Sequence, residues 1–325
     1  MKSTLIALLF VTLICYQCNS TKPGPRLLPD SSGRINTLTV VMPKKDWSGP
    51  LGERVREELQ KEYEGLPLVE PQFSVTYLPP PLFDGFAKHS RNIILFTKDS
   101  ISAFNIYQDR YAAPQVVSSI KGEDASVQAF YFEENKDLIK RTIIANERKE
   151  KRRRMRKSPA KTKSIEKRFG ISMLYPTAYK EFKVDTNFVW IQKEIPKGHL
   201  NLIVYALDRK AYASKISSKV LKIRDSIGKI HIPGRLEDTH MSNDNSYRPY
   251  YYKMELKGRE TYLTKGIWSV SDDYMAGPFV HYMIADIPRE RWLVIEGFAF
   301  APSANKREYM FELETIARSV QFNKK

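Results

Sequence analysis

A dense basic segment near the middle of the chain constrains the fold more than any other feature. Residues 148–168 hold 12 basic and 2 acidic residues, a net charge of +10 in a chain of 325 residues with a net charge of +16. A segment with so few apolar side chains cannot form a core. We therefore expect two folded domains, joined by a basic helical linker over residues 148–168.

The composition on either side of this segment is that of a folded protein. Hydrophobic residues make up 42% of the chain and aromatic residues 12%, which provides enough apolar surface for two cores and excludes wholesale disorder. Only residues 4–14 form a long apolar run, so a polytopic membrane protein is excluded as well.

The N-terminus is typical of an export signal. Lys2 precedes the apolar run 4–14, which is too short to span a bilayer as a helix, and we interpret residues 1–18 as a signal peptide. Residues 19–34 then form a polar tether. Such a signal directs the protein out of the cytoplasm, wherever the signal peptide is cleaved.

Two interpretations of this signal remain open. In the first, Cys18 is the lipidated first residue of a membrane-anchored lipoprotein, although Gln17 stands where a small residue is usual. In the second, cleavage follows Ser20 and nothing is lipidated. Cys15 and Cys18 are the only cysteines, so the body of the chain holds no disulfide, thiolate metal site or cysteine nucleophile.

The N-terminal domain, over residues 35–147, shows mixed α/β patterning. A β-branched run at 35–41 predicts a strand, and a four-residue apolar spacing predicts a helix from Pro50 that Gly65 ends. A long helix is expected to begin near Glu133 and to become wholly polar after Ala145. The other expected strands are 73–78, 92–97, 103–107 and 115–120, and a short helix is expected over 82–91.

The C-terminal domain, over residues 169–325, is rich in strands. The runs after residue 250 predict an antiparallel meander. A helix over 216–227 should end at Gly228, and Asn305 should cap a last helix. The expected strands are 171–175, 187–194, 200–206, 250–256, 259–270, 279–285, 292–300 and 319–322. The fold class is therefore α+β: two mixed α/β layer domains, the second a mainly antiparallel sheet covered by helices.

Several stretches in a fixed order carry a family resemblance. They are RLLPDSSGRINTLTVVMP (26–43), DRYAAPQVV (109–117), RFGISMLYPTAYK (168–180), WIQKEIPKGHLNLIVY (190–205), IRDSIG (223–228), DDYMAGPFVHY (272–282) and IEGFAFAPSANKREYMFELE (295–314). With these stretches the chain resembles the domain-of-unknown-function 4837 family of uncharacterised bacterial envelope lipoproteins, over about residues 26–322. The resemblance implies a lipoprotein of the Gram-negative envelope and no reaction. The second half is also similar in layout to the α/β/α sandwich of photosystem accessory proteins, which mostly act as assembly factors or adaptors.

The basic segment is the main candidate binding site. Its candidate contacts with an anionic surface, either anionic lipid or lipopolysaccharide, are Arg152, Arg153, Arg154, Arg156 and Lys157. The alternative is a solvated linker helix without a ligand. We exclude nucleic acid as a partner, because the segment lacks the interleaved aromatic residues that stack on bases and because the chain is exported.

Other chemistry has weaker support in the sequence. Trp190, Trp268 and Trp292 lie on expected strands, where they either form core or line a ligand groove with residues 250–252. The five histidines show no metal-binding spacing; the polar loop 237–244 is a candidate cation site supported only by its composition. We expect no catalytic residue, no metal and no cofactor.

These observations predict a non-enzymatic envelope lipoprotein that acts as a binding or assembly module at a membrane surface. Its expected partners are the membrane, through the N-terminal anchor, and a protein of the cell envelope or periplasm. The alternative is an exported hydrolase-like enzyme with a site made of acidic residues. That enzyme would need carboxylates from several strands to converge, with one raised pKa in a cleft.

Overall fold

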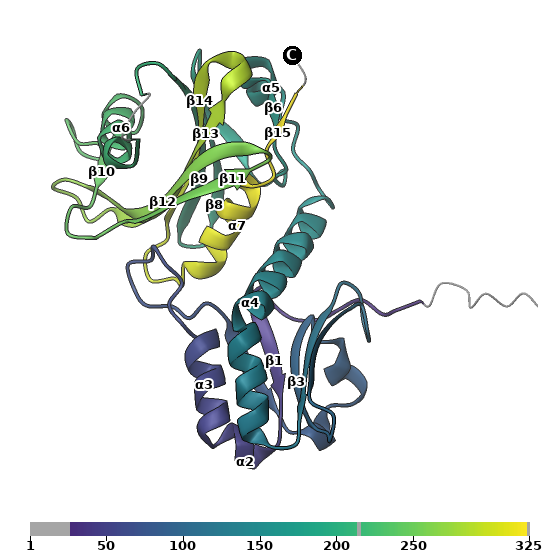
Figure 1. The fold of residues 1–325 in the computed structure, drawn as a ribbon. Coiled ribbons are helices and arrows are strands. Elements are labelled where there is room, and N and C mark those ends of the chain that lie inside the picture. Colours follow the sequence, from purple (N-terminus) through teal and green to yellow (C-terminus); the bar gives the residue numbers. More distant parts are fainter. Residues whose placement is uncertain (1–26, 213–215, 324–325) are drawn as a thin grey trace, which may run out of the picture.

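Two separate sheets, one mixed and one antiparallel, give the chain the predicted α+β fold (Figure 1). The structure is a computed structural model, and it describes residues 27–212 and 216–323. The predicted signal peptide, with Cys15 and Cys18, lies outside the described residues. None of the described helices is long and apolar enough to cross a membrane.

The N-terminal domain is built on a five-stranded sheet with the strand order β2-β1-β3-β5-β4. Its strands are β1 (Thr37–Val41), β2 (Ser74–Leu78), β3 (Asn92–Lys98), β4 (Ala103–Gln108) and β5 (Val116–Gly122). The first three and β5 are parallel, and β4 runs antiparallel to β5 at the edge. The central strands β1, β3 and β5 are buried almost throughout, as expected of strands in a largely parallel sheet.

Helices cover only one face of this first sheet. The apolar side chains of α3 (Pro50–Leu59) and of the first half of α4 (Ala125–Met155) pack on it in one core cluster. The opposite face carries a much smaller cluster, centred on Val41, Ile93 and Val117. Short elements complete the domain: α2 (Lys44–Trp47) and the 3-10 turns η2 (Pro80–Leu82) and η3 (Gly85–His89).

The C-terminal domain is an eight-stranded antiparallel sheet with the order β10-β12-β13-β14-β9-β8-β7, and β11 also pairs with β12. Its strands are β7 (Lys180–Asp185), β8 (Phe188–Ile195), β9 (Gly198–Asp208), β10 (Met241–Asn243), β11 (Tyr250–Leu256), β12 (Arg259–Val270), β13 (Ala276–Asp286) and β14 (Arg291–Phe300). Strands β12, β13 and β14 are neighbours in sequence and in space, which confirms the predicted meander.

Helices cover both faces of this second sheet. Helix α6 (Ile216–His231) packs on one face, while α7 (Arg307–Ala317) and α5 (Lys163–Phe169) pack on the other. A two-stranded ladder of β6 (Ile171–Ser172) and β15 (Gln321–Phe322) brings the chain's end beside α5, and the 3-10 turn η4 (Ile287–Arg289) connects β13 to β14.

Two predicted helix boundaries in the N-terminal domain are wrong. Helix α4 begins at Ala125 rather than near Glu133, because the Asp124 side chain accepts the N–H groups of Ser126 and Val127 and caps the helix there. Helix α3 ends at Leu59 rather than at Gly65. The chain after it turns away from the first sheet, and Tyr63 is buried in the core of the C-terminal domain instead.

Two further predictions fail in the C-terminal domain for reasons of packing. Helix α6 continues through Gly228 to His231. The glycine is required by packing rather than as a helix end, because it lies against the carbonyl oxygen of Met241, where a Cβ would overlap. Asn305 does not cap α7. The carboxylate of Glu70, in the N-terminal domain, accepts the N–H groups of Lys306 (2.6 Å) and Arg307 (3.0 Å) in its place.

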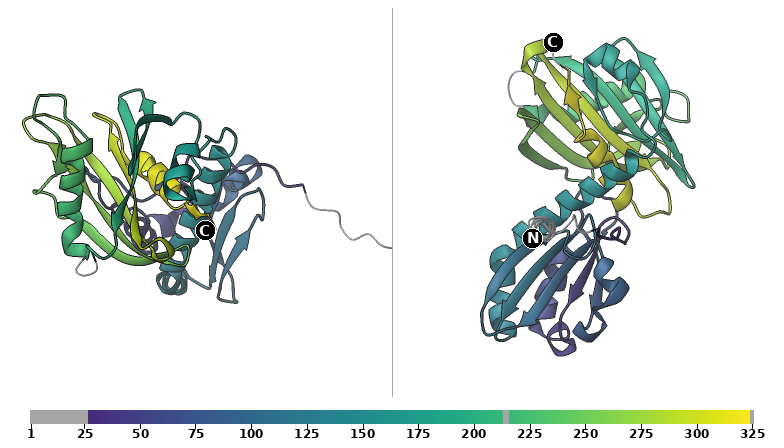
Figure 2. Two further views of the ribbon diagram at one scale, coloured as in Figure 1. Left: turned by 90° about the horizontal axis from the view of Figure 1, so that it is seen from above. Right: turned by 90° about the vertical axis from the view of Figure 1, so that its right-hand side faces the viewer.

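The two domains meet along α4 and the loop 60–73. Figure 2 shows α4 running from the N-terminal domain to the C-terminal domain without a break. Its 31 residues span about 46 Å, and its last residue, Met155, is buried in the C-terminal core. The segment predicted as a solvated linker is therefore partly structural.

Candidate functional site

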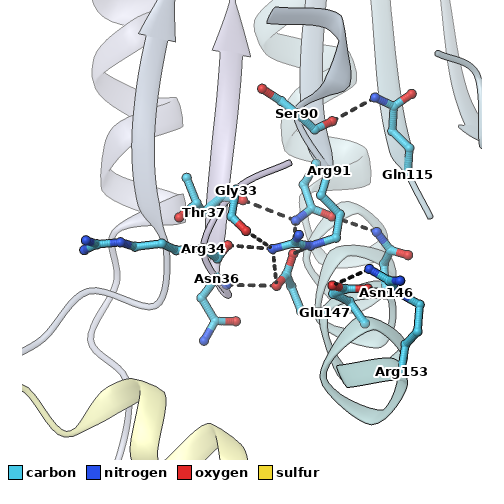
Figure 3. A network of polar contacts seen from close by, with 12 residues as sticks. Gly33, Arg34, Asn36, Thr37, Ser90, Arg91, Gln115, Asn146, Glu147 and Arg153 are labelled. Carbon is cyan, nitrogen blue, oxygen red and sulfur yellow. Dashed lines mark hydrogen bonds and ion pairs between the residues drawn. The ribbon is translucent and has the colours of Figure 1, made fainter. Parts of the chain in front are cut away.

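A buried ion pair anchors α4 to the first sheet at the point where the helix leaves that sheet (Figure 3). Arg91 Nε donates to Glu147 Oε1 at 2.7 Å, and both side chains are fully buried. Glu147 also accepts the backbone N–H of Asn36 at 3.0 Å. The second guanidinium nitrogen of Arg91 donates to the carbonyl oxygens of Gly33 and Arg34. This network fixes the segment before β1 against α4.

The next turns of α4 enter the interface between the domains. Arg148 Nη2 lies 3.4 Å from Glu314 Oε2, and Lys151 Nζ lies 2.5 Å from Glu312 Oε2. Both glutamates belong to α7. Two basic residues of the predicted linker therefore neutralise buried carboxylates of the C-terminal domain and are only partly exposed to solvent.

The two glutamates of α7 receive further partners from several elements. Lys265 on β12 and Tyr63 contact Glu314 at 2.8 and 2.7 Å, and Lys193 on β8 contacts Glu312 at 2.7 Å. Burial opposes the ionisation of Glu314, but Lys265 and Arg148 outweigh it and lower its pKa to about 2. Glu314 is therefore ionised at neutral pH and holds the two domains together electrostatically.

The C-terminal end of the basic run opens on a hollow that gathers positive charge. This hollow, of about 480 Å³, is lined by Arg152, Arg156, Ser172, Met173, Leu174, Lys257, Arg318, Ser319 and Gln321. Four of these residues are cationic, and none is acidic. We call this the basic hollow.

The arginines of the basic hollow are not neutralised within it. Among the described residues, no carboxylate lies within ion-pair distance of Arg152 or Arg156. Burial lowers the pKa of Arg152, and repulsion by Arg156 and Arg148 lowers it further. Arg318 is oriented by its hydrogen bond to the hydroxyl of Tyr282, at 3.0 Å. Clustered guanidinium groups without a counter-ion favour an anion, and they match the oxygens of phosphate or carboxylate groups best.

The structure separates the five predicted anionic contacts. Arg152 and Arg156 line the basic hollow, whereas Arg153 and Arg154 both pair with Glu150, at 2.6 and 2.7 Å. Arg154 also donates to the carbonyl oxygen of Gly33 at 3.2 Å. Lys157 is exposed. Contact with an anionic surface stays a prediction for all five.

The three predicted tryptophans lie together under α6. Trp190, Trp268 and Trp292 are all buried in the cluster between the second sheet and that helix, and Trp190 Nε1 donates to Asn201 at 2.9 Å. Their positions favour a role in the core, and the ligand groove with residues 250–252 stays a prediction.

Acidic and basic residues gather together in another described hollow. Four carboxylates line this hollow, those of Glu58, Glu62, Glu64 and Asp137. They come from helices and a loop rather than from several strands, and they alternate with lysine and arginine. Every described carboxyl group with a resolved shift has a lowered pKa. No three His, Cys, Asp or Glu residues of the described part, loop 237–244 included, are placed to hold a metal ion.

A second buried polar cluster lies inside the C-terminal domain. Arg224 on α6 forms a two-point ion pair with Glu296 on β14, at 2.9 and 2.7 Å, and His281 Nδ1 lies 2.8 Å from the same carboxylate. Burial opposes ionisation of Glu296, but Arg224 and His281 lower its pKa to about 2. The cluster is enclosed, and it attaches α6 to the sheet.

Sequence reasoning missed half of the basic hollow. Lys257 stands in the β11–β12 turn and Arg318 follows α7, each more than 100 residues after Arg152 along the chain. Both are isolated cations in the sequence, and only the fold brings them beside Arg152 and Arg156.

The comparisons with known proteins assign a family. The family model described as "Domain of unknown function (DUF4837)" matches residues 158–319. The C-terminal half of the chain belongs to the DUF4837 family. Residues 31–156 match a separate model, also a domain of unknown function (DUF8532), so the predicted family is confirmed while the N-terminal domain has its own model.

Comparison with individual proteins adds no function. No curated protein matches the chain. The Ran-binding protein Mog1p of Saccharomyces cerevisiae is similar at 10% identity and a TM-score of 0.31, over 47% of this chain and 90% of that one. A single-residue variant of protein Mog1 matches the same shares at 9% identity and a TM-score of 0.29. A similarity this low carries no inference about function.

Proposed function

We propose that this DUF4837 protein is an exported, non-enzymatic binding module of the bacterial cell envelope. Lipid on Cys18 anchors it to a membrane, and its basic hollow holds a phosphate-bearing group at that membrane's surface. The carrying observation is the hollow of about 480 Å³ with four cationic side chains and no acidic one. The export signal over residues 1–18 supports the location.

The hollow fits a ligand that carries its charge on a compact group. Arg152 and Arg156 present guanidinium groups one helical turn apart, and Ser172 lines the same hollow. Phosphate is the chemistry that anionic lipid headgroups and lipopolysaccharide share, and both predicted sources therefore fit. We prefer this function to the hydrolase alternative, because the carboxylates that line one described hollow alternate there with lysine and arginine.

Vesicle binding tests this function. The unlipidated Cys18→Ser chain is sedimented with vesicles of phosphatidylglycerol or phosphatidylcholine, with and without Arg152→Gln/Arg156→Gln. We expect binding to phosphatidylglycerol alone, weakened about thirtyfold by the double substitution, since each Lys or Arg near an anionic surface contributes about 1 kcal/mol. Binding should also weaken steeply with salt.

The matched control is Lys149→Gln/Lys161→Gln, which removes the same charge from exposed positions outside the basic hollow. An equal loss in both double variants would mean diffuse attraction to the segment and would contradict the proposal. Binding by lipopolysaccharide but not phosphatidylglycerol would identify the other source of phosphate. Anchoring is tested separately, by mass spectrometry of the Cys18 peptide from native membranes; an unmodified Cys18 contradicts it.

A further inference from the structure

The uncovered face of the first sheet carries exposed apolar side chains at one place. Leu82 in η2 is 63% exposed and Phe86 in η3 is 75% exposed. Beneath them, Phe83 packs edge-on against Tyr111, with ring centroids 5.8 Å apart, over the small core of this face. Exposed leucine and phenylalanine tips on a rigid aromatic base are unusual for a surface that meets only water.

Cations surround these aromatic rings. The Arg110 guanidinium lies 4.5 Å from the ring centre of Tyr107 and 5.2 Å from that of Tyr111. Lys88 Nζ lies 5.9 Å from the Tyr111 ring and pairs with Asp84 at 2.6 Å. We call the group of Leu82, Phe86, Lys88, Tyr107, Arg110 and Tyr111 the aromatic face. Aromatic rings flanked by Lys and Arg are characteristic of surfaces at the membrane–water boundary.

The chain enters the N-terminal domain along the aromatic face. The carbonyl oxygen of Pro29 accepts the N–H of Ala113 at 2.9 Å, and the N–H of Ser31 donates to the carbonyl oxygen of Ala113 at 3.0 Å. The N–H of Ser32 donates to the carbonyl oxygen of His89, at the end of η3, at 2.8 Å. Figure 1 shows the segment before β1 leaving the domain on the side away from α3.

The length of the preceding chain limits the distance to the proposed anchor. Eight residues lie between Cys18 and Leu27, the first described residue, so nine Cα–Cα steps separate the two. Even fully extended they span at most about 30 Å, which is less than the length of α4. A lipid on Cys18 would therefore hold the side of the domain that contains the aromatic face close to the bilayer.

We propose that the aromatic face lies against the membrane that carries the anchor, with Leu82 and Phe86 inserted among the lipid headgroups and Lys88 and Arg110 beside their phosphates. This inference rests on the proposed function, because it needs the lipid on Cys18. The occupant is the lipid surface itself. The surface would fix the orientation of the protein on the membrane.

Site-specific probes test this orientation. The lipidated chain, which begins at Cys18, carries either Phe86→Cys or Phe130→Cys; it is labelled with an environment-sensitive fluorophore and reconstituted in phosphatidylglycerol vesicles. Phe130 is the matched control, because it is 60% exposed and lies on α4, which covers the opposite face of the same sheet. Both sites are exposed, so neither substitution disturbs a core.

We expect spin-labelled lipid to quench the probe at residue 86 at least twofold more than the probe at residue 130. Equal quenching at the two residues, with the Cys18 peptide modified in the same sample, would overturn the orientation alone. A Cys18 peptide without lipid would overturn the anchor and the orientation together. A probe at residue 86 that is protected only when an envelope protein is added would show that a protein, and not the membrane, covers this face.

Discussion

Replacing Glu314 by glutamine should destabilise the protein in a way that depends on pH. The carboxylate is buried and faces Arg148 of α4, Lys265 of β12 and the hydroxyl of Tyr63. Glutamine keeps the shape and loses the charge, so two partly buried cations would remain without their counter-ion. Removing one partner of a buried charge cluster typically costs about 3–5 kcal/mol.

The lowered pKa of Glu314 gives a second estimate of how much its carboxylate contributes to the free energy of unfolding. A carboxyl group whose pKa falls from 4.5 to about 2 on folding contributes stability above pH 4.5 and loses it as the pH falls towards 2. At 1.36 kcal/mol per pH unit the contribution at pH 7 is about 3 kcal/mol. At pH 3 about 1.4 kcal/mol of it should remain. The free energies of unfolding of wild type and Glu314→Gln should therefore converge as the pH is lowered.

Urea denaturation at pH 7 and pH 3 measures this difference. Tryptophan fluorescence is a suitable signal, because Trp190, Trp268 and Trp292 lie in the C-terminal domain that contains Glu314. The control is Glu133→Gln, an exposed residue of α4 paired with Lys136, which should change stability by less than about 0.5 kcal/mol. Equal stability of Glu314→Gln and wild type at pH 7, or a difference that does not shrink at pH 3, would refute the reasoning.

Three further substitutions test individual contacts, each measured as the urea-dependent free energy of unfolding. Gly228→Ala should destabilise by about 1–3 kcal/mol, because the new Cβ overlaps the carbonyl of Met241, although alanine favours helices; a stabilised variant would contradict this packing. Glu70→Ala should cost about 0.5–2 kcal/mol by removing the cap of α7, and Glu64→Ala, outside that cap, is its control. Tyr63→Phe should cost about 1 kcal/mol for the lost hydrogen bond to Glu314, and an unchanged stability would mean that this contact contributes nothing.

The strands could be predicted from the sequence because their signal is local. The β-branched runs at 35–41 and 92–97 and the alternating runs after residue 250 carry their own periodicity, and β1, β3 and the β12–β14 meander lie where expected. Helix ends were less predictable, because their causes are tertiary. Glu70 caps α7 from the other domain, and Met241 explains why a glycine stands inside α6. Neither contact can be predicted from the residues next to the helix end in the sequence.

The candidate site was only half predictable for the same reason. The density of Lys and Arg over residues 148–168 was visible, but their individual partners were not. Glu312 and Glu314 are about 160 residues further along the chain, and they withdraw Lys151 and Arg148 from solvent. What remains for a ligand is the pair Arg152 and Arg156, completed by Lys257 and Arg318. Charge density thus indicated the region, and the fold selects the residues.

Titration with a soluble headgroup tests the central claim most directly. Arginine Nε–Hε signals of the unlipidated chain are followed by nuclear magnetic resonance while glycerol 3-phosphate is added. The account predicts saturable shifts at Arg152, Arg156 and Arg318, and none at Arg153 or Arg154, which Glu150 already occupies. Shifts of similar size at all surface arginines, or no saturable shift in the basic hollow, would contradict it.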